Sequence, residues 1–232
     1  MENTEKKTDK LTPKEWWENI WYHYKWILIF GMLIAVFLLY SLVQCTASKD
    51  PDVNIMHVGP MLISSASADQ IESTLAGLSE DYNDDGAFKL DLLDITVNKF
   101  GNSESSQDPI NYDHNNSGLQ RFQTEIRAGD AYIYLLDEEF FKICVEEGLL
   151  TKLDSVIDDA DMPENVIDGY GVKLSELDAY SLPGLSSVPE GAILCLRRSP
   201  EYDELKYERT VEAWEGNRCT FVNIIKYRSE SK

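Results

Sequence analysis

The sequence predicts an α/β fold, with a mostly parallel sheet covered by helices on both faces and preceded by one transmembrane helix. Two observations support this prediction. Segments with strand character and segments with helix character alternate along residues 53–232, which is typical of right-handed crossovers between parallel strands. Closer to the N-terminus, residues 26–43 form an apolar run without a single charge.

The apolar run predicts a membrane anchor. Its eighteen residues, at about 1.5 Å per residue, extend ~27 Å as a helix, enough to cross the hydrocarbon core of a bilayer. Aromatic residues, which prefer the headgroup layer, crowd its N-terminal flank. They are Trp16, Trp17, Trp21, Tyr22, Tyr24 and Trp26.

The distribution of lysines predicts the orientation of this anchor. Five lysines precede it, and Lys49 follows it closely before acidic residues take over. Basic residues flank the cytoplasmic end of a span. We therefore expect a cytoplasmic amphipathic tail at 1–25, a transmembrane helix at 26–43, a linker at 44–52 and an extracytoplasmic α/β domain at 53–232. The sequence therefore predicts a single-pass protein of the cell membrane.

The alternatives to an uncleaved anchor are a cleaved signal peptide and a lipoprotein. A cleaved signal peptide normally starts with a short basic region, whereas here a long tail containing acids precedes the run. A lipoprotein would be modified at Cys45, but the residue before that cysteine should be small and is Gln44. The uncleaved anchor is therefore favoured, and the tail is interpreted as a helix at the membrane interface or as a partner for another membrane helix.

Charge excludes one class of partner. The formal net charge of the 232 residues is −20, and the first 45 residues carry as many lysines as acids. The whole deficit therefore belongs to the predicted domain. A surface of this sign repels nucleic acid and anionic lipid headgroups, so nucleic-acid binding is not expected.

Apolar runs and turn residues predict the elements of the domain. The run at 131–136 is apolar throughout, as in a strand buried on both faces. Capping-box patterns beginning at Ser67 and Ser117 predict two helix starts, and Gly129 lies where a helix ends. We expect strands at 53–58, 88–97, 131–136, 191–196 and 219–227, helices at 67–78, 117–128, 138–147 and 201–214, and a polar surface loop at 101–116.

Residues 122–154 resemble the extracellular solute-binding proteins of bacterial ABC importers, which have the type 2 periplasmic-binding fold. In that family a helix ends in Ala-Gly-Asp, a strand leads to an acidic corner, and a further helix ends in Gly-Leu before Leu-Asp. The resemblance implies a single periplasmic-binding-like lobe on a bacterial, Gram-positive, cell surface, where the family has two lobes around a ligand cleft. The matching residues are Ala128, Gly129, Asp130, Asp137, Gly148, Leu149, Leu153 and Asp154, followed later by Ser199 and Pro200.

The fold class predicts where a ligand would bind. Doubly wound sheets bind ligands at the carboxyl ends of their strands. Those ends are at 59–65 and at residues 137 and 138. The predicted ligand-binding residues are Ser64, Ser65 and Asp137.

One acidic segment has the form of half a calcium loop. Asp81, Asn83 and Asp85 place oxygens at its first, third and fifth positions, and Gly86 follows. The acid expected at the twelfth position is replaced by Leu92, so Asp91 or Asp94 would have to substitute. A plain turn is the favoured interpretation, and calcium is the alternative; no other cofactor is expected.

Enzyme signatures are weak. The predicted domain has two histidines, His57 in the first strand and His114 in the polar loop, and His57 is interpreted as structural. Cys144 fits a buried helix face; Cys195 and Cys219 fall in two expected strands, which leaves one disulfide as an alternative to free thiols. The sequence predicts a non-enzymatic, membrane-tethered binding or interaction module whose partner is another envelope or membrane protein. The alternative is a solute-capture lobe of an ABC-type transporter.

Overall fold

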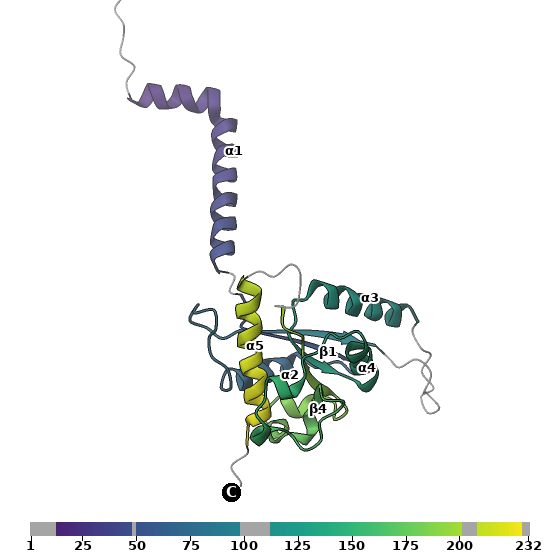
Figure 1. Ribbon diagram of the computed structural model, residues 1–232. Coiled ribbons are helices and arrows are strands. Elements are labelled where there is room, and N and C mark those ends of the chain that lie inside the picture. Colours follow the sequence, from purple (N-terminus) through teal and green to yellow (C-terminus); the bar gives the residue numbers. More distant parts are fainter. Residues whose placement is uncertain (1–12, 48–49, 98–111, 201–207, 229–232) are drawn as a thin grey trace, which may run out of the picture. The chain divides into compact units, whose positions relative to one another are not determined.

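The computed structural model describes residues 13–47, 50–97, 112–200 and 208–228 (Figure 1). They belong to two compact units, Met1–Lys49 and Asp50–Lys232. The start of the predicted tail, residues 48–49 of the linker, residues 98–111 in and before the predicted loop, and residues 201–207 of the last predicted helix lie outside the described residues.

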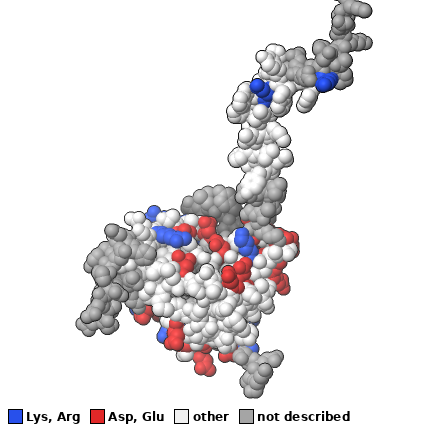
Figure 2. Space-filling model, turned by 180° about the vertical axis from the view of Figure 1, so that it is seen from behind, with Lys and Arg blue, Asp and Glu red and all other residues white. Residues whose placement is uncertain are grey.

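The described part of the first unit is one helix, α1 (Pro13–Ala47). Within it, Trp21–Ser41 is long and apolar enough to cross a membrane, and none of that stretch is buried. Figure 2 shows that the helix carries no charged side chain for several turns beyond its lysines. The described residues therefore contain one apolar span of the predicted kind, at Trp21–Ser41. The helix continues to Ala47, so the first residues of the predicted linker are helical.

The second unit contains a mixed five-stranded sheet in the order β2-β1-β3-β5-β4. β1 is parallel to both of its neighbours, whereas β5 is antiparallel to both of its own. The α/β class is confirmed, but a mostly parallel sheet is not. The reversal arises because β5 starts beside the end of β3, with Ile193 opposite Leu136. The strands are β1 (Val53–Gly59), β2 (Leu90–Thr96), β3 (Ile133–Leu136), β4 (Gly171–Lys173) and β5 (Ile193–Leu196).

Helices cover both faces of this sheet. They are α2 (Ser65–Leu75), α3 (Tyr112–Ala128), α4 (Glu138–Glu146) and α5 (Glu208–Lys226). Short 3₁₀ turns fill the connection between α4 and β5: η1 (Leu153–Ser155), η2 (Asp159–Asp161), η3 (Leu174–Glu176), η4 (Asp178–Ser181) and η5 (Leu185–Ser187).

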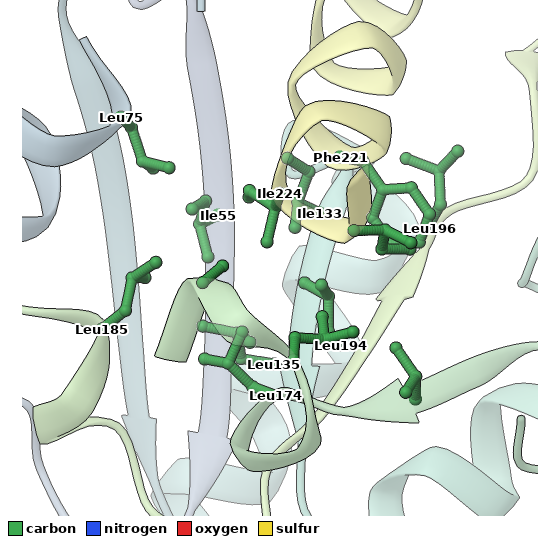
Figure 3. Close-up of a cluster of buried hydrophobic side chains, with 14 of the residues drawn as sticks. Ile55, Leu75, Ile133, Leu135, Leu174, Leu185, Leu194, Leu196, Phe221 and Ile224 are labelled. Atoms are coloured by element: carbon green, nitrogen blue, oxygen red, sulfur yellow. The ribbon is translucent and has the colours of Figure 1, made fainter. Parts of the chain in front are cut away.

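Alternation along the strands divides the interior into two cores. In β3, Ile133 and Leu135 belong to one apolar cluster, and Tyr134 and Leu136 belong to the other. Successive side chains of a strand point to opposite faces, so each cluster fills one face. We call the cluster shared with α2 and α5 the first core (Figure 3), and the cluster shared with α3 and α4 the second core.

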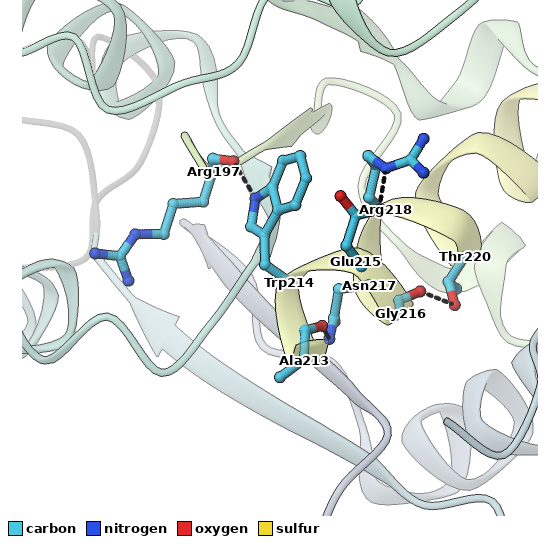
Figure 4. Close-up of polar contacts among 8 residues, drawn as sticks. All are labelled: Arg197, Ala213, Trp214, Glu215, Gly216, Asn217, Arg218 and Thr220. Carbon is cyan, nitrogen blue, oxygen red and sulfur yellow. Dashed lines mark hydrogen bonds and ion pairs between the residues drawn. The ribbon is translucent and has the colours of Figure 1, made fainter. Parts of the chain in front are cut away.

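The predicted strand at 219–227 is wrong, because residues 219–226 form the C-terminal part of α5. Trp214, Phe221 and Ile224 are buried in the first core at helical spacing. Polar contacts also hold this helix (Figure 4): the indole Nε1 of Trp214 donates to the carbonyl oxygen of Arg197 at 2.9 Å. Packing of one apolar stripe outweighed the strand propensity of the β-branched residues.

Two helix starts also differ from the sequence prediction. α2 begins at Ser65, because Ser64 rather than Ser67 is its N-cap. α3 begins at Tyr112, so the last residues of the predicted loop are helical. The predicted C-cap is confirmed: Gly129 directly follows α3 with a φ of +78°. A side chain there would be strained and would meet the guanidinium of Arg197.

Cys144, Cys195 and Cys219 are free thiols. Cys195 belongs to the second core, whereas Cys219 lies on α5, which packs on the opposite face of the sheet. The disulfide alternative therefore has no support from the positions of these residues. Burial raises the pKa of the Cys144 thiol to about 12 and that of Cys195 well above its usual value.

Candidate functional site

The strand order places a topological switch point at the carboxyl ends of β1 and β3. From β1 the chain passes through α2 to β2 on one side, and then through α3 to β3 on the other side of β1. The connection after β1 leads to the first-core face, and the connection after β3 leads to the second-core face. Two loops that diverge in this way leave a crevice between them, which is where such sheets bind ligands.

A cavity of about 730 Å³ lies at this switch point. The ends of β1, β3 and β4, the start of β5 and the first turn of α4 surround it. Several of its lining side chains are exposed, so a ligand held there remains in contact with water. It is lined by His57, Val58, Gly59, Pro60, Asp137, Glu138, Phe141, Lys142, Asn165, Ile167, Asp168, Lys173, Glu176, Pro189, Gly191, Ala192 and Ile193.

Asp137 is the predicted site residue that the structure places in this cavity. One carboxylate oxygen, Oδ1, accepts hydrogen bonds of 3.1 Å from the backbone N–H groups of Glu139 and Phe140, which caps α4. The other oxygen, Oδ2, is buried and has no hydrogen-bond partner among the residues that the structure describes. The cap fixes the direction of the carboxylate, and Oδ2 is left as an acceptor without a donor.

A second oxygen of the same kind lies at the same edge of the sheet. Thr96 Oγ1 is also buried without a hydrogen-bond partner in the described part of the chain. Thr96 pairs with Gly59 in β1, and the N–H of Asp137 donates to the carbonyl oxygen of Val58. Both oxygens therefore belong to the ends of the two strands that flank β1.

Carboxylates outnumber lysines around the cavity. Asp137, Glu138, Asp168 and Glu176 face it, together with Lys142 and Lys173. The Nζ of Lys142 lies 2.7 Å from a carboxylate oxygen of Glu138. This hydrogen bond, followed by the charges of Glu138 and Asp168, raises the pKa of Lys142 above its usual value.

His57 has the contacts of a structural histidine. Its side chain is 1% exposed, and its Nδ1 lies 2.8 Å from Oδ1 of Asp94 on the neighbouring strand. The second oxygen of Asp94 accepts from the backbone N–H of Ile63 at 2.6 Å. The pair therefore ties the loop after β1 to β2, and this contact agrees with the structural role predicted for His57.

Ser64 and Ser65 lie at the start of α2, away from the cavity that Asp137 lines. The hydroxyl of Ser64 accepts from the N–H of Ser67 at 3.1 Å as the N-cap of α2, and Ser65 is the first residue of that helix. Neither lines the cavity. The structure therefore brings one of the three predicted ligand residues to the switch point and assigns Ser64 a capping role.

The side-chain oxygens of the half calcium loop accept hydrogen bonds from the backbone of the same loop. Asp81 accepts from the N–H groups of Asp85 and Gly86, Asn83 accepts from Asp85, and Asp85 accepts from Ala87. Leu92, at the twelfth position, packs against the first core. Within the described residues, no group of three or more His, Cys, Asp or Glu side chains is arranged to hold a metal ion.

Sequence reasoning did not anticipate the cavity residues after α4. Asn165, Asp168, Lys173 and Glu176 come from the loop before β4, from β4 and from η3. β4 has three residues, too few for a periodic signal. One local signal was present in the sequence: Asp168 is followed by Gly169, and an Asp-Gly pair is typical of a turn. In the structure both residues have positive φ.

Comparison of the chain with models of protein families, with curated proteins and with solved structures found no match. The resemblance to extracellular solute-binding proteins therefore has no support beyond the residues on which it was based.

Proposed function

We propose that this chain is a membrane-tethered, extracytoplasmic binding module without catalytic activity. The observation that supports binding is the cavity at the switch point, where diverging loops leave room for a small ligand. Its volume of about 730 Å³ is in the range of small-molecule sites, roughly 300–1,000 Å³. In this proposal the partner that receives the ligand, or responds to it, is another envelope or membrane protein.

Binding rather than catalysis is favoured by the state of the groups around the cavity. The imidazole of His57 is buried and bonded to Asp94, and one oxygen of Asp137 caps a helix. A general base must reach the proton that it removes, and a buried, structurally engaged ring is badly placed to do so.

Tethering is supported by the apolar stretch Trp21–Ser41, and the extracytoplasmic side by the lysines ahead of it. In intact cells we expect a membrane-impermeant amine reagent to label the exposed lysines Lys142, Lys152 and Lys173 and to spare the tail lysines Lys6, Lys7 and Lys10. Peptide mass spectrometry reads each site. Broken cells, in which both groups should react, are the control, and labelling of the tail alone in intact cells would reverse the orientation.

The binding proposal is tested by filling the cavity. Gly191 lines it, and a Cβ built there meets nothing within 4 Å. We expect the full chain in nanodiscs to bind members of a panel of amines, amino acids, sugars and short peptides in calorimetry. Because one open domain buries less of a ligand than two closing lobes, the expected dissociation constant is about 10 µM or weaker, equivalent to about 7 kcal/mol.

The variant Gly191→Leu should abolish this binding, and Gly77→Leu, at an exposed turn outside the cavity, should retain it. The absence of any ligand from the panel, or equal binding by the two variants, would contradict a binding function of this cavity. A submicromolar solute would favour the solute-capture alternative.

A further inference from the structure

The lining of the cavity has an excess of negative charge, because it contains four carboxylates and two lysines. Of the four carboxylates around it, Glu138 is paired with Lys142 across 2.7 Å. Asp137 has no lysine partner at hydrogen-bonding distance among the described residues; its one engaged oxygen accepts from backbone N–H groups. Glu176 is exposed at the rim. A ligand that enters this cavity therefore meets more acceptors and negative charge than donors.

Within this excess of negative charge, Oδ2 of Asp137 is the acceptor that the described residues leave without a donor. The atom is buried without a hydrogen-bond partner in the described structure, and the cap on Oδ1 prevents the carboxylate from turning away. A buried acceptor without a donor costs free energy, and a charged donor recovers the most. Asp137 lines the cavity together with Glu138 and Lys142. The Glu138–Lys142 pair is exposed, so these two side chains are free to rearrange around a ligand.

We propose that the cavity binds a small organic amine, a ligand with a primary ammonium or guanidinium group, and that Asp137 is the residue that accepts its hydrogen bond. This inference rests on the proposed binding function. The formal net charge of −20 acts in the same direction, because a strongly acidic domain attracts cations and repels anions.

Three probes of equal chain length and different charge test the proposal: pentane-1,5-diamine, pentane-1,5-diol and glutarate. With the full chain in nanodiscs at neutral pH and low salt, we expect the diamine to bind about tenfold or more tightly than the diol, and glutarate not to bind. Added salt should weaken the diamine and leave the diol unchanged.

Variants locate the effect. Asp137→Asn keeps an oxygen for the cap, since asparagine is as good an N-cap as aspartate, and should weaken the diamine about tenfold. The matched control is Asp91→Asn, which removes the same charge from an exposed position on β2 outside the cavity and should change the affinity less than about twofold. Lys173→Met, at an exposed side chain, removes a competing cation and should tighten the diamine about threefold.

Preference for the diol or for glutarate, or equal effects of Asp137→Asn and Asp91→Asn, would overturn the amine proposal. The proposed function would survive that result if neutral or anionic members of the panel bound in a manner that Gly191→Leu abolished. If Asp137→Asn failed to fold, Lys173→Met would decide, since an unchanged diamine affinity in that variant contradicts a charge-dependent site.

Discussion

Replacing Phe221 with alanine is expected to lower the free energy of unfolding of the domain by about 3–5 kcal/mol. The ring is 0% exposed and belongs to the first core, between α5 and the sheet (Figure 3). Its removal loses apolar burial and leaves a cavity that the surrounding side chains fill only in part. Pulse proteolysis of the full chain across a urea series, in nonionic detergent, measures this change. The readout is the amount of the protease-resistant domain fragment that survives at each urea concentration.

Val222→Ala is the control for Phe221→Ala. Val222 is the next residue of α5 and is half-buried, so its truncation should cost about 1 kcal/mol or less. Similar losses at the two positions would contradict the packing of α5 through Phe221.

The same helix shows where sequence reasoning failed. Residues 219–227 contain several β-branched and aromatic residues, and local propensity favoured a strand. The buried positions Trp214, Asn217, Phe221 and Ile224 recur at intervals of three and four, which is a helical period. That period becomes clear only when Asn217 is counted among the inward residues. The burial of a polar residue cannot be recognised from the sequence alone.

The sheet and the site were predictable to different extents. β3 and α4 agree with their predictions within two residues, because each is a short apolar or amphipathic run between clear stop signals. The direction of β5 was not predictable, since pairing depends on contacts between segments far apart in sequence. Asp137 is predicted by a fold-level rule about strand ends. Lys173 and Glu176, by contrast, reach the cavity from a strand of three residues and from the 3₁₀ turn that follows it.

Asn217 provides the second large expected effect. The side chain is 0% exposed and connects α5 to β1. Its Oδ1 accepts from the backbone N–H of Asn54 at 2.8 Å, and its Nδ2 donates to the carbonyl oxygens of Asp52 at 3.1 Å and Ala213 at 2.8 Å. The last of these contacts is drawn in Figure 4.

Asn217→Leu keeps a side chain of similar size and removes all three contacts. The N–H of Asn54 and the carbonyl of Asp52 then lose their partner on α5, at about 1–3 kcal/mol for each group. We therefore expect the free energy of unfolding to fall by about 2–6 kcal/mol. Hydrogen exchange of the peptide that spans β1 should accelerate in parallel, because the N–H of Asn54 is one of the groups released.

The matched control for Asn217→Leu is Asn223→Leu, six residues further along the same helix. Asn223 is exposed, and its Nδ2 donates to the carbonyl oxygen of Leu78 at 2.7 Å. Water replaces a lost partner at an exposed group, so this variant should cost about 1 kcal/mol or less and leave exchange in β1 unchanged. Equal costs at the two asparagines would mean that the polar contacts of Asn217 add nothing beyond its helix position, and that packing of the first core alone holds α5 to β1.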